Sequence, residues 1–279
     1  MDKRSFLKTT ITASIGLGTI PLMNSCQSVM KPNIGLQLYT LRDEMEINPR
    51  KILEYVAKVG YKELETAGYK EGKIYGMEPS NFNGMVADLG MKIVSGHISY
   101  NDLKFDWDRV LNMLQETNQK FVVLPYLEEN ERNLKVYNEV IELLNDKGAE
   151  LRKLDKVMAY HNHDFEFDRI ENIVPMELLL EETDPNLVDF ELDLYWISKA
   201  GVSALDLFKR YENRFSLWHV KDMSLKGDFT EIGNGVIDFQ EIFDQAQLAG
   251  RQHFFIEQDQ SIDPRKSIET SFNNVQNLF

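Results

Sequence analysis

The chain has 279 residues, of which 43% are hydrophobic and 27% charged, an ordinary composition for a globular protein. Its formal charge is −14, and such a negative field repels phosphate backbones, which argues against a general nucleic-acid binder. With 16 Gly, 8 Pro, one Cys and no apolar run of about 20 residues, the chain is not collagen-like, disulfide-stapled or a polytopic membrane protein.

The first 30 residues have the pattern of an export signal. Three basic residues precede an apolar stretch over 11–23, and a small residue then precedes Cys26, an order typical of a secretory signal. Residues 3–8 resemble a twin-arginine export motif with Lys in the first position, and Cys26 resembles a bacterial lipoprotein acceptor. We therefore expect residues 1–30 to be a leader, and the protein to be periplasmic or anchored to the membrane by a lipid on Cys26. An ordinary cysteine in a frayed terminus is the alternative.

From residue 34 onward, short apolar runs alternate with amphipathic stretches, which indicates strands followed by helices. In chain order the pattern predicts strand 34–39, helix 49–59, strand 61–66, helix 80–89, strand 92–97, helix 106–117, strand 121–125, helix 130–154, strand 157–161, helix 175–182, strand 188–194, helix 204–211, strand 215–219, helix 239–249, strand 254–257 and helix 264–278. Gly148 predicts an irregularity inside the longest helix.

Eight strand–helix pairs in strict alternation indicate parallel β-α-β units, and eight of them over about 245 residues predict a closed (β/α)₈ TIM barrel. The rival α/β fold, a doubly wound open sheet, lacks its G-x-G-x-x-G signature after the first strand. No linker-like stretch divides the chain. Residues 31–279 are therefore predicted to form a single barrel domain.

Polar residues end four consecutive strands of the second half. Active sites of this fold lie at the carboxyl ends of the strands, where side chains alternate between the barrel interior and the helix layer. One inward-facing set is His161, Asp193, His219 and Glu257. Two imidazoles and two carboxylates suit a divalent cation such as Mn²⁺, Co²⁺ or Zn²⁺, with Mg²⁺ as a further possibility. The alternative for each residue is a helix cap or a hydrogen-bond partner.

Five further residues lie near strand ends. Glu191 is left out of the site because it can point into the helix layer, and His253 is expected at the opposite end of the barrel. Glu65 and His97 end the second and third strands and are candidates for substrate contacts at the mouth. Trp196 is a candidate for an apolar wall against a sugar ring. A purely structural role is the alternative for each candidate.

The chain after residue 33 resembles the xylose isomerase-like sugar (phosphate) isomerase/epimerase family. The residues that carry this resemblance are the runs 34–42, 160–167, 219–222 and 256–257 and the loop 233–239. The resemblance implies a TIM barrel that acts on a small carbohydrate with a divalent metal held by strands five to eight. By position the ligands are His161, Asp193, His219 and Glu257. Relatives often form dimers or tetramers, which leaves a homo-oligomer open.

One departure from the family concerns His161, which stands where many relatives have Glu. In the epimerases that Glu and the one on strand eight form the acid/base pair, so His161 either supplies a base of different pKa or removes the symmetry of the pair. The His-Asn-His form resembles a branch with inosose dehydratase-like and keto-glycoside lyase or hydratase-like proteins. The shared first step is removal of a proton next to a carbonyl. We assign Glu257 as ligand and base, His163 and Lys221 to substrate oxygens, and Glu166 as a second acid/base or hydroxyl contact.

The leading hypothesis is a metal-dependent isomerase or epimerase-like enzyme that acts on a non-phosphorylated sugar or keto-sugar. Export and the lack of an Arg/Lys cluster at the eighth strand's exit argue against a sugar phosphate. A lyase or hydratase on 3-keto-glycosides or inosose-like substrates is the second hypothesis. A repair endonuclease on the same barrel is disfavoured by the five His and the charge of −14. A non-catalytic exported sugar-binding barrel is the fourth hypothesis.

Overall fold

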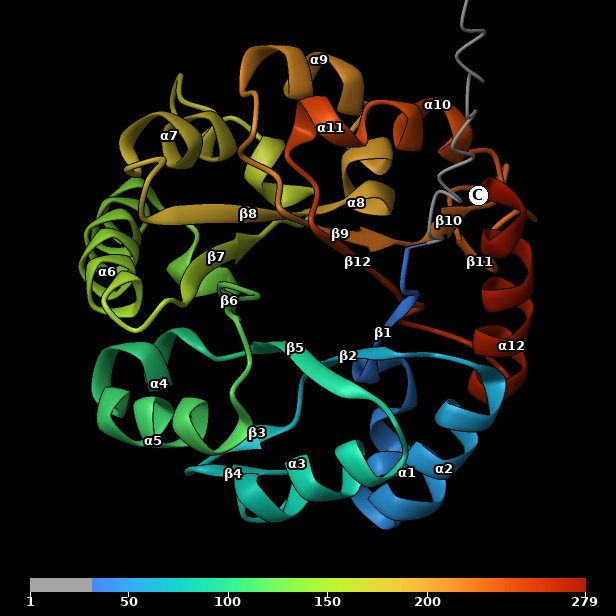
Figure 1. Ribbon diagram of the computed structural model, residues 1–279. Helices are drawn as coiled ribbons and strands as arrows, with labels where there is room; N and C mark the ends of the chain where they lie inside the picture. Colours follow the sequence, from blue (N-terminus) through green and yellow to red (C-terminus); the bar gives the residue numbers. More distant parts are fainter. Residues whose placement is uncertain (1–31) are drawn as a thin grey trace, which may run out of the picture. The chain divides into compact units, whose positions relative to one another are not determined.

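The computed structural model describes residues 32–279, so the expected leader and Cys26 lie outside the described residues. Eight parallel strands close into a barrel in the order β1-β12-β9-β8-β7-β6-β5-β2, with β2 paired to β1. Figure 1 shows the helices as an outer ring around these strands. Each new strand pairs with the previous barrel strand of the chain, which confirms the predicted single (β/α)₈ barrel.

The barrel strands begin and end close to the predicted positions. They are β1 (Gly35–Gln37), β2 (Glu63–Thr66), β5 (Lys92–His97), β6 (Phe121–Leu124), β7 (Val157–His161), β8 (Val188–Asp193), β9 (Leu217–Val220) and β12 (His253–Ile256). Two hairpins stand outside the barrel: β3 (Tyr69–Lys70) with β4 (Lys73–Ile74), and β10 (Asp222–Met223) with β11 (Phe229–Thr230). The sequence pattern did not predict these hairpins.

The helices comprise the predicted outer ring and shorter pieces at strand exits. The α-helices are α1 (Arg42–Ile47), α2 (Pro49–Val59), α3 (Pro79–Asp88), α4 (Tyr100–Phe105), α5 (Trp107–Thr117), α6 (Leu134–Arg152), α7 (Pro175–Glu182), α8 (Leu194–Lys199), α9 (Ala204–Arg210), α10 (Phe239–Asp244), α11 (Ala246–Ala249) and α12 (Pro264–Val275). The 3₁₀ turns are η1 (Leu38–Leu41), η2 (Glu129–Glu131), η3 (Phe165–Phe167) and η4 (Gln276–Leu278). None of the helices within residues 32–279 has the length and apolarity needed to cross a bilayer.

Local sequence explains how the outer helices begin and end. In α2 the Asn48 side chain accepts a hydrogen bond from the Lys51 amide at 3.1 Å, and the helix ends at Gly60, whose φ of 124° is available to glycine. One face of this helix packs on the barrel through Ile52, Leu53 and Val56. The apolar residues that recur with the helical period thus form the face of the helix that packs on the sheet.

Two of the predicted helices differ from the structure. The stretch 130–154 divides into the turn η2 and helix α6, because the Asn133 side chain accepts from the Val136 amide and starts a new helix. The predicted irregularity at Gly148 is wrong, since α6 continues through it. A Cβ atom at Gly148 would lie 2.6 Å from the Leu187 carbonyl oxygen, so glycine serves close packing here. The stretch 239–249 also divides, at Gln245.

The barrel interior changes from apolar to polar along the strands. An apolar cluster separate from the helix–sheet core fills the lower interior: Val94, Phe121, Val123, Ala159, Leu217 and Phe255. Two residues further along three of these strands, the same inward face carries His161, His219 and Glu257. The apolar layer therefore forms a dry support beneath a polar layer at the carboxyl ends.

Candidate active site

The polar layer contains two groups of side chains that share His219. The outer group is His161, Asp193, His219 and Glu257, and the inner group is Glu65, His97, Glu191 and His219. In each group one potential ligand atom from every residue lies within 4.8 Å of the others. The outer group is the set that the sequence predicted, and the ends of β7, β8, β9 and β12 bring it together.

The contacts of the outer group are short. Asp193 Oδ2 lies 3.2 Å from His161 Nε2 and 3.6 Å from His219 Nδ1. His219 Nδ1 lies 2.8 Å from Glu257 Oε2. All four side chains are buried, and Asp193 and His219 are fully so. Two nitrogens and two carboxylates thus face one point inside the barrel.

The chemistry of these donors fits a divalent cation. His161 Nδ1 lies 3.1 Å from the Pro125 carbonyl oxygen, and that acceptor keeps the ring proton on Nδ1 and leaves the lone pair on Nε2. His219 Nδ1 faces Glu257 Oε2 at 2.8 Å, whereas its Nε2 lies 2.6 Å from Glu65 Oε1. A carboxylate or carbonyl behind a histidine is the usual support of a metal-binding ring. His161 therefore turns a free lone pair toward the outer group, and His219 turns Nδ1 toward it, where a cation would displace the proton of the charged ring.

Asp193 has a second role in the local fold. Its Oδ1 accepts hydrogen bonds at 3.0 Å from the amides of Tyr195 and Trp196, which caps helix α8. Its Oδ2 is left for the outer group. One carboxylate thus joins the group to the helix that carries Trp196.

Lys221 neutralises much of the negative charge at this site. Its Nζ lies 2.6 Å from Glu257 Oε2, 2.9 Å from Asp193 Oδ2 and 2.8 Å from Asp259 Oδ1. Burial opposes its charge, yet Asp193 and Asp259 hold the pKa of Lys221 well above its usual value. Burial likewise favours neutral Glu257, but the charges of Lys221 and His219 hold the pKa of Glu257 below its usual range. The lysine is therefore charged and Glu257 ionised at neutral pH.

Two histidines near the cavity are neutral at pH 7. Burial, with the nearby charge of His219, lowers the pKa of His161 to about 4. Burial also lowers the pKa of His163 well below its usual value, and the charge of Lys221 adds to that effect. These rings can donate or accept hydrogen bonds, but they bring no positive charge to the site.

A cavity of about 640 Å³ opens above the polar layer. Six of the predicted site residues line it: His97, His161, His163, Trp196, Lys221 and Glu257. The His163 ring stacks on Phe165 with centroids 5.4 Å apart and lies 5.1 Å from the Trp196 ring. The cavity therefore has a polar floor and an aromatic wall, which is the general composition of a small-molecule site.

Glu166 does not reach the cavity, contrary to the expectation of an acid/base or hydroxyl contact. Its side chain is fully buried and accepts hydrogen bonds from the Tyr160 hydroxyl and the His163 amide, each at 2.7 Å. The 3₁₀ turn over 165–167 folds the carboxyl group back under the loop. Burial raises its pKa to about 7. Glu166 supports the segment that carries His163.

Glu65 and Glu191 also lie elsewhere than expected. Glu65 is fully buried below the mouth, where its Oε1 accepts from Gln37 Nε2 at 2.7 Å. Glu191 points into the barrel rather than into the helix layer, and its Oε2 lies 3.0 Å from His97 Nε2. The alternation along β8 explains this, because Glu191 precedes inward-facing Asp193 by two residues. His253 lies at the amino end of β12, as expected.

Sequence reasoning missed several cavity-lining residues. Tyr39, Arg42, Tyr126, Phe229 and Asp259 line the cavity but were not chosen as site residues. Asp259 had a usable signal, since it follows Glu257 by two residues at a strand exit. The other four lie on exits and hairpins whose course depends on tertiary contacts.

The loop over 233–237 is organised by Asp222, next to Lys221 in the sequence. The Asp222 carboxylate accepts hydrogen bonds from four backbone amides, those of Met223, Gly233, Gly235 and Ile237, at distances of 2.8–3.2 Å. A Cβ atom at Gly235 would lie 2.1 Å from Asp222 Oδ1, so glycine is required for this approach.

Comparisons with known proteins agree with this architecture. No family model matches the chain. Among curated proteins, an inosose dehydratase from Geobacillus thermodenitrificans is 28% identical over 144 residues, which cover 44% of this chain and 48% of that enzyme. The chain thus matches only about half the length of its curated relatives.

Solved structures resemble the chain over most of its length. A sugar phosphate isomerase/epimerase from Parabacteroides distasonis is 28% identical with a TM-score of 0.77, covering 92% of this chain and 98% of that one. The IOLI protein, solved with a zinc atom, is 12% identical with a TM-score of 0.69, covering 88% and 98%, and shows the fold alone. These likenesses confirm the resemblance to xylose isomerase-like sugar phosphate isomerase/epimerase barrels.

Proposed function

We propose that this protein is a divalent-metal-dependent enzyme that removes the proton beside the carbonyl group of a non-phosphorylated sugar or keto-sugar, as an isomerase or epimerase does. The observation that carries the proposal is the outer group at the floor of the cavity, where a ring nitrogen of each histidine and an oxygen of each carboxylate face one point. The relatives support it, because they are named for isomerisation, epimerisation or dehydration of sugars and inosose.

The cation would be held by His161, Asp193, His219 and Glu257, and Mn²⁺, Co²⁺ and Zn²⁺ suit this donor set better than Mg²⁺. When bound, such an ion supplies Lewis acidity that stabilises negative charge on a carbonyl oxygen. The zinc atom in the IOLI structure supports this choice of metal class.

The chain's own residues supply the proton transfer. Glu257 is ionised, lies at the cavity floor and is the base that takes the proton from the carbon beside the carbonyl. Charged Lys221 donates hydrogen bonds to substrate oxygens, and neutral His163 contacts a hydroxyl from the aromatic wall. His163 Nδ1 is buried without a hydrogen-bond partner among the described residues, so a substrate oxygen would satisfy it.

Elimination is the second candidate, favoured by the asymmetry of the cavity. Carboxylates of Glu257 and Asp259 contact Lys221, whereas His161 and His163, which also line the cavity, are neutral imidazoles. After Glu257 takes the proton, a carbon–carbon double bond forms as the neighbouring carbon–oxygen bond breaks. Lys221 supplies the proton to the departing oxygen. A 3-keto-glycoside or an inosose-like ring would react in this way.

The charges around the cavity disfavour a phosphate group. Glu128, Glu257 and Asp259 line the cavity, and Lys221 is already in contact with three carboxylates. Arg42 donates to the Tyr39 carbonyl oxygen at 2.9 Å and stacks over the Tyr39 ring. A phosphate would thus meet negative charge, whereas hydroxyl groups would find both donors and acceptors.

Hydrogen–deuterium exchange at carbon tests the proposal. Metal-loaded protein is mixed in D₂O with a 3-keto-glycoside or with inosose, and products are followed by mass spectrometry and NMR. We expect one deuterium beside the carbonyl, incorporated far more slowly after Glu257→Gln and at an unchanged rate after His253→Gln at the far end of the barrel. A product that keeps all the substrate's heavy atoms and is heavier only by the deuterium indicates isomerisation or epimerisation, and loss of water or aglycone indicates elimination. Tight sugar binding without exchange would mean a non-catalytic binding barrel and overturn the proposal.

We also propose that the chain is exported and acquires a lipid on Cys26, on the strength of the pattern in residues 1–30. Mass spectrometry of the membrane fraction tests this, because a lipidated mature protein would begin at Cys26 and carry the added acyl mass. A full-length chain in the cytoplasmic fraction would contradict the proposal.

A further inference from the structure

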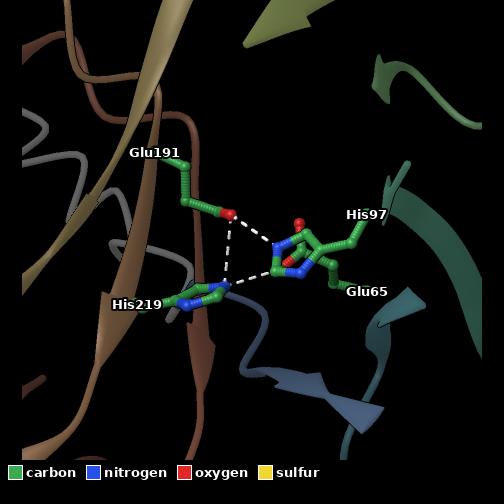
Figure 2. Close-up of side chains that lie close together, drawn as sticks. All are labelled: Glu65, His97, Glu191 and His219. Carbon is green, nitrogen blue, oxygen red and sulfur yellow. Dashed lines mark hydrogen bonds and ion pairs between the residues drawn. The ribbon is translucent and has the colours of Figure 1, made fainter. Parts of the chain in front are cut away.

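We propose that the inner group is a second cation site, built to take a divalent transition metal such as Zn²⁺. The proposed function uses only the outer group, so this inference goes beyond it. The inner group comes from four strands, with Glu65 on β2, His97 on β5, Glu191 on β8 and His219 on β9. Figure 2 shows the four side chains pointing toward one another across the barrel interior.

The geometry of the inner group matches four ligands around one ion. His97 Nε2 lies 3.2 Å from Glu65 Oε1 and 3.0 Å from Glu191 Oε2 (Figure 2). His219 Nε2 lies 2.6 Å from Glu65 Oε1 and 3.3 Å from Glu191 Oε2. Zinc–ligand bonds of about 2.1 Å in a tetrahedron place neighbouring ligand atoms about 3.4 Å apart. Three of the four nitrogen–oxygen separations lie within a few tenths of an ångström of that expected ligand–ligand distance.

Hydrogen bonds alone cannot satisfy this arrangement. Nitrogens and oxygens alternate in four close contacts, but each Nε2 carries at most one hydrogen, so two ring hydrogens serve four contacts. A proton placed on a carboxyl oxygen does not help, because a nitrogen that accepts it must give up its own. One cation at the centre accepts a lone pair from all four atoms at once.

The inner group is also short of other partners. Glu65 Oε2 and Glu191 Oε1 are buried without a hydrogen-bond partner among the described residues. Within that part of the chain, neither carboxylate forms an ion pair with Lys or Arg, whereas the outer group has Lys221. Buried carboxylates need a compensating positive charge. In the metal-free chain the charged rings of His97 and His219 supply it, because the carboxylates raise the pKa of both rings; a divalent cation would displace those ring protons and supply the charge in their place.

The two sites meet in His219. Its Nδ1 faces Asp193 and Glu257, and its Nε2 faces Glu65 and Glu191. With both sites filled, His219 would offer one ring nitrogen to each cation, and the charge of the two cations would favour the loss of both ring protons. Two imidazoles in the ligand set select a transition metal over Ca²⁺ or Mg²⁺. The His97 side chain lines the cavity, which provides a path for the ion to enter.

Metal stoichiometry of separate variants tests the inference. Protein is stripped with chelator, dialysed against Zn²⁺, and analysed for zinc per chain together with its thermal unfolding temperature. We expect two equivalents in the wild type and one in His97→Gln or Glu191→Gln, which remove inner ligands only. Asp193→Asn removes an outer ligand only and should also retain one. His253→Gln is the matched control outside both groups and should keep two.

The outcomes separate the two proposals. One equivalent in the wild type, kept by His97→Gln and Glu191→Gln but lost in Asp193→Asn, overturns the inner site and leaves the proposed function intact. One equivalent lost in His97→Gln but kept in Asp193→Asn supports the inner site and contradicts the proposed function. Zinc must also raise the unfolding temperature of Asp193→Asn, because a folded chain without such a shift has no inner site. His219→Ala cannot serve here, since it removes a ligand from both groups.

Discussion

At the scale of single residues, Glu257 combines two roles, as ligand of the outer group and as base. Glu257→Gln keeps an oxygen donor but removes the ionised group, so we expect proton exchange to fall by about 10²–10⁴-fold. The Michaelis constant should change far less at saturating metal. Deuterium incorporation under single-turnover conditions measures the effect. Asp259→Asn, which alters the other carboxylate at Lys221, should lower the rate much less, and equal losses would contradict the assignment of Glu257 as base.

Lys221 contacts the same oxygens of Asp193 and Glu257 that face the outer group, so its ammonium competes with a cation. In Lys221→Met the metal-free protein should lose about 3–5 kcal/mol of unfolding free energy, because the buried carboxylates of Asp193 and Glu257 lose the positive charge of the lysine. The same variant should bind Zn²⁺ at least about tenfold more tightly, a difference of 1.4 kcal/mol. Urea unfolding with and without chelator, and zinc titration, measure the two effects. Weaker zinc binding would show that the lysine supports the cation rather than replaces it.

At the scale of elements, Gly148 in α6 and Gly84 in α3 form a matched pair. Helix propensity favours alanine over glycine by about 1 kcal/mol in both helices. At Gly84 no atom lies within 4 Å of an added Cβ, so Gly84→Ala should stabilise the protein by about that amount. At Gly148 the added atom would lie 2.6 Å from the Leu187 carbonyl oxygen. Gly148→Ala should therefore destabilise by about 1–3 kcal/mol.

Urea unfolding of Gly84→Ala and Gly148→Ala measures the change in unfolding free energy that each substitution causes. Changes of opposite sign in the two variants would confirm that α6 packs closely against the chain before β8. Stabilisation by both substitutions would mean that the backbone at Leu187 moves away freely.

Element positions were largely predictable because the alternation of apolar and amphipathic stretches sets them locally. Strand ends carrying His161 and His219 followed directly from this pattern. Short elements were not predictable, since their starts depend on contacts made only in the fold: Asp193 caps α8 only once β8 has placed it. Glu166 was misjudged for the same reason, because its partner Tyr160 becomes its neighbour through the η3 turn.

At the scale of the whole molecule, barrel closure at the amino end involves a buried acid. Glu63 on β2 accepts from His253 Nδ1 of β12 at 2.6 Å and pairs with Lys92 of β5 at 3.1 Å. Burial favours the neutral acid, but the His253 hydrogen bond and charge lower the pKa of Glu63 below its usual value. A lowered folded-state pKa means stability that is present above the unfolded pKa and lost as pH falls through the folded one.

Glu63→Gln should consequently cost about 1.5–3 kcal/mol at pH 7, the range for hydrogen bonds to a charged group. The cost should shrink as pH falls below the unfolded value of about 4.3. Urea unfolding of both proteins at pH 7, 5 and 3.5 measures it. A cost that is constant across this range would assign the effect to packing rather than to charge.

The barrel itself was predictable because eight strand–helix pairs in strict alternation are typical of a closed parallel barrel. The division of its polar layer into two groups was not predictable from alternation alone. Glu191 and Asp193 share a face of β8, yet they belong to different groups because they lie at different depths. Depth depends on the stagger between strands, and the bulge between Leu64 and Glu65 that shifts the register of β2 against β5 leaves no mark in the sequence pattern.

The two oxygens of Asp193 have different partners, and this arrangement should make the fluorescence of Trp196 sensitive to cation binding. One oxygen faces the outer group, while the other holds the amide of Trp196, whose indole Nε1 is buried without a partner among the described residues. Any redistribution of charge on that carboxylate alters the field at an indole only one helical turn away. The emission of Trp196 should thus follow cation loading in real time, without a label, and Trp196→Phe identifies its share of the signal from the chain's three tryptophans.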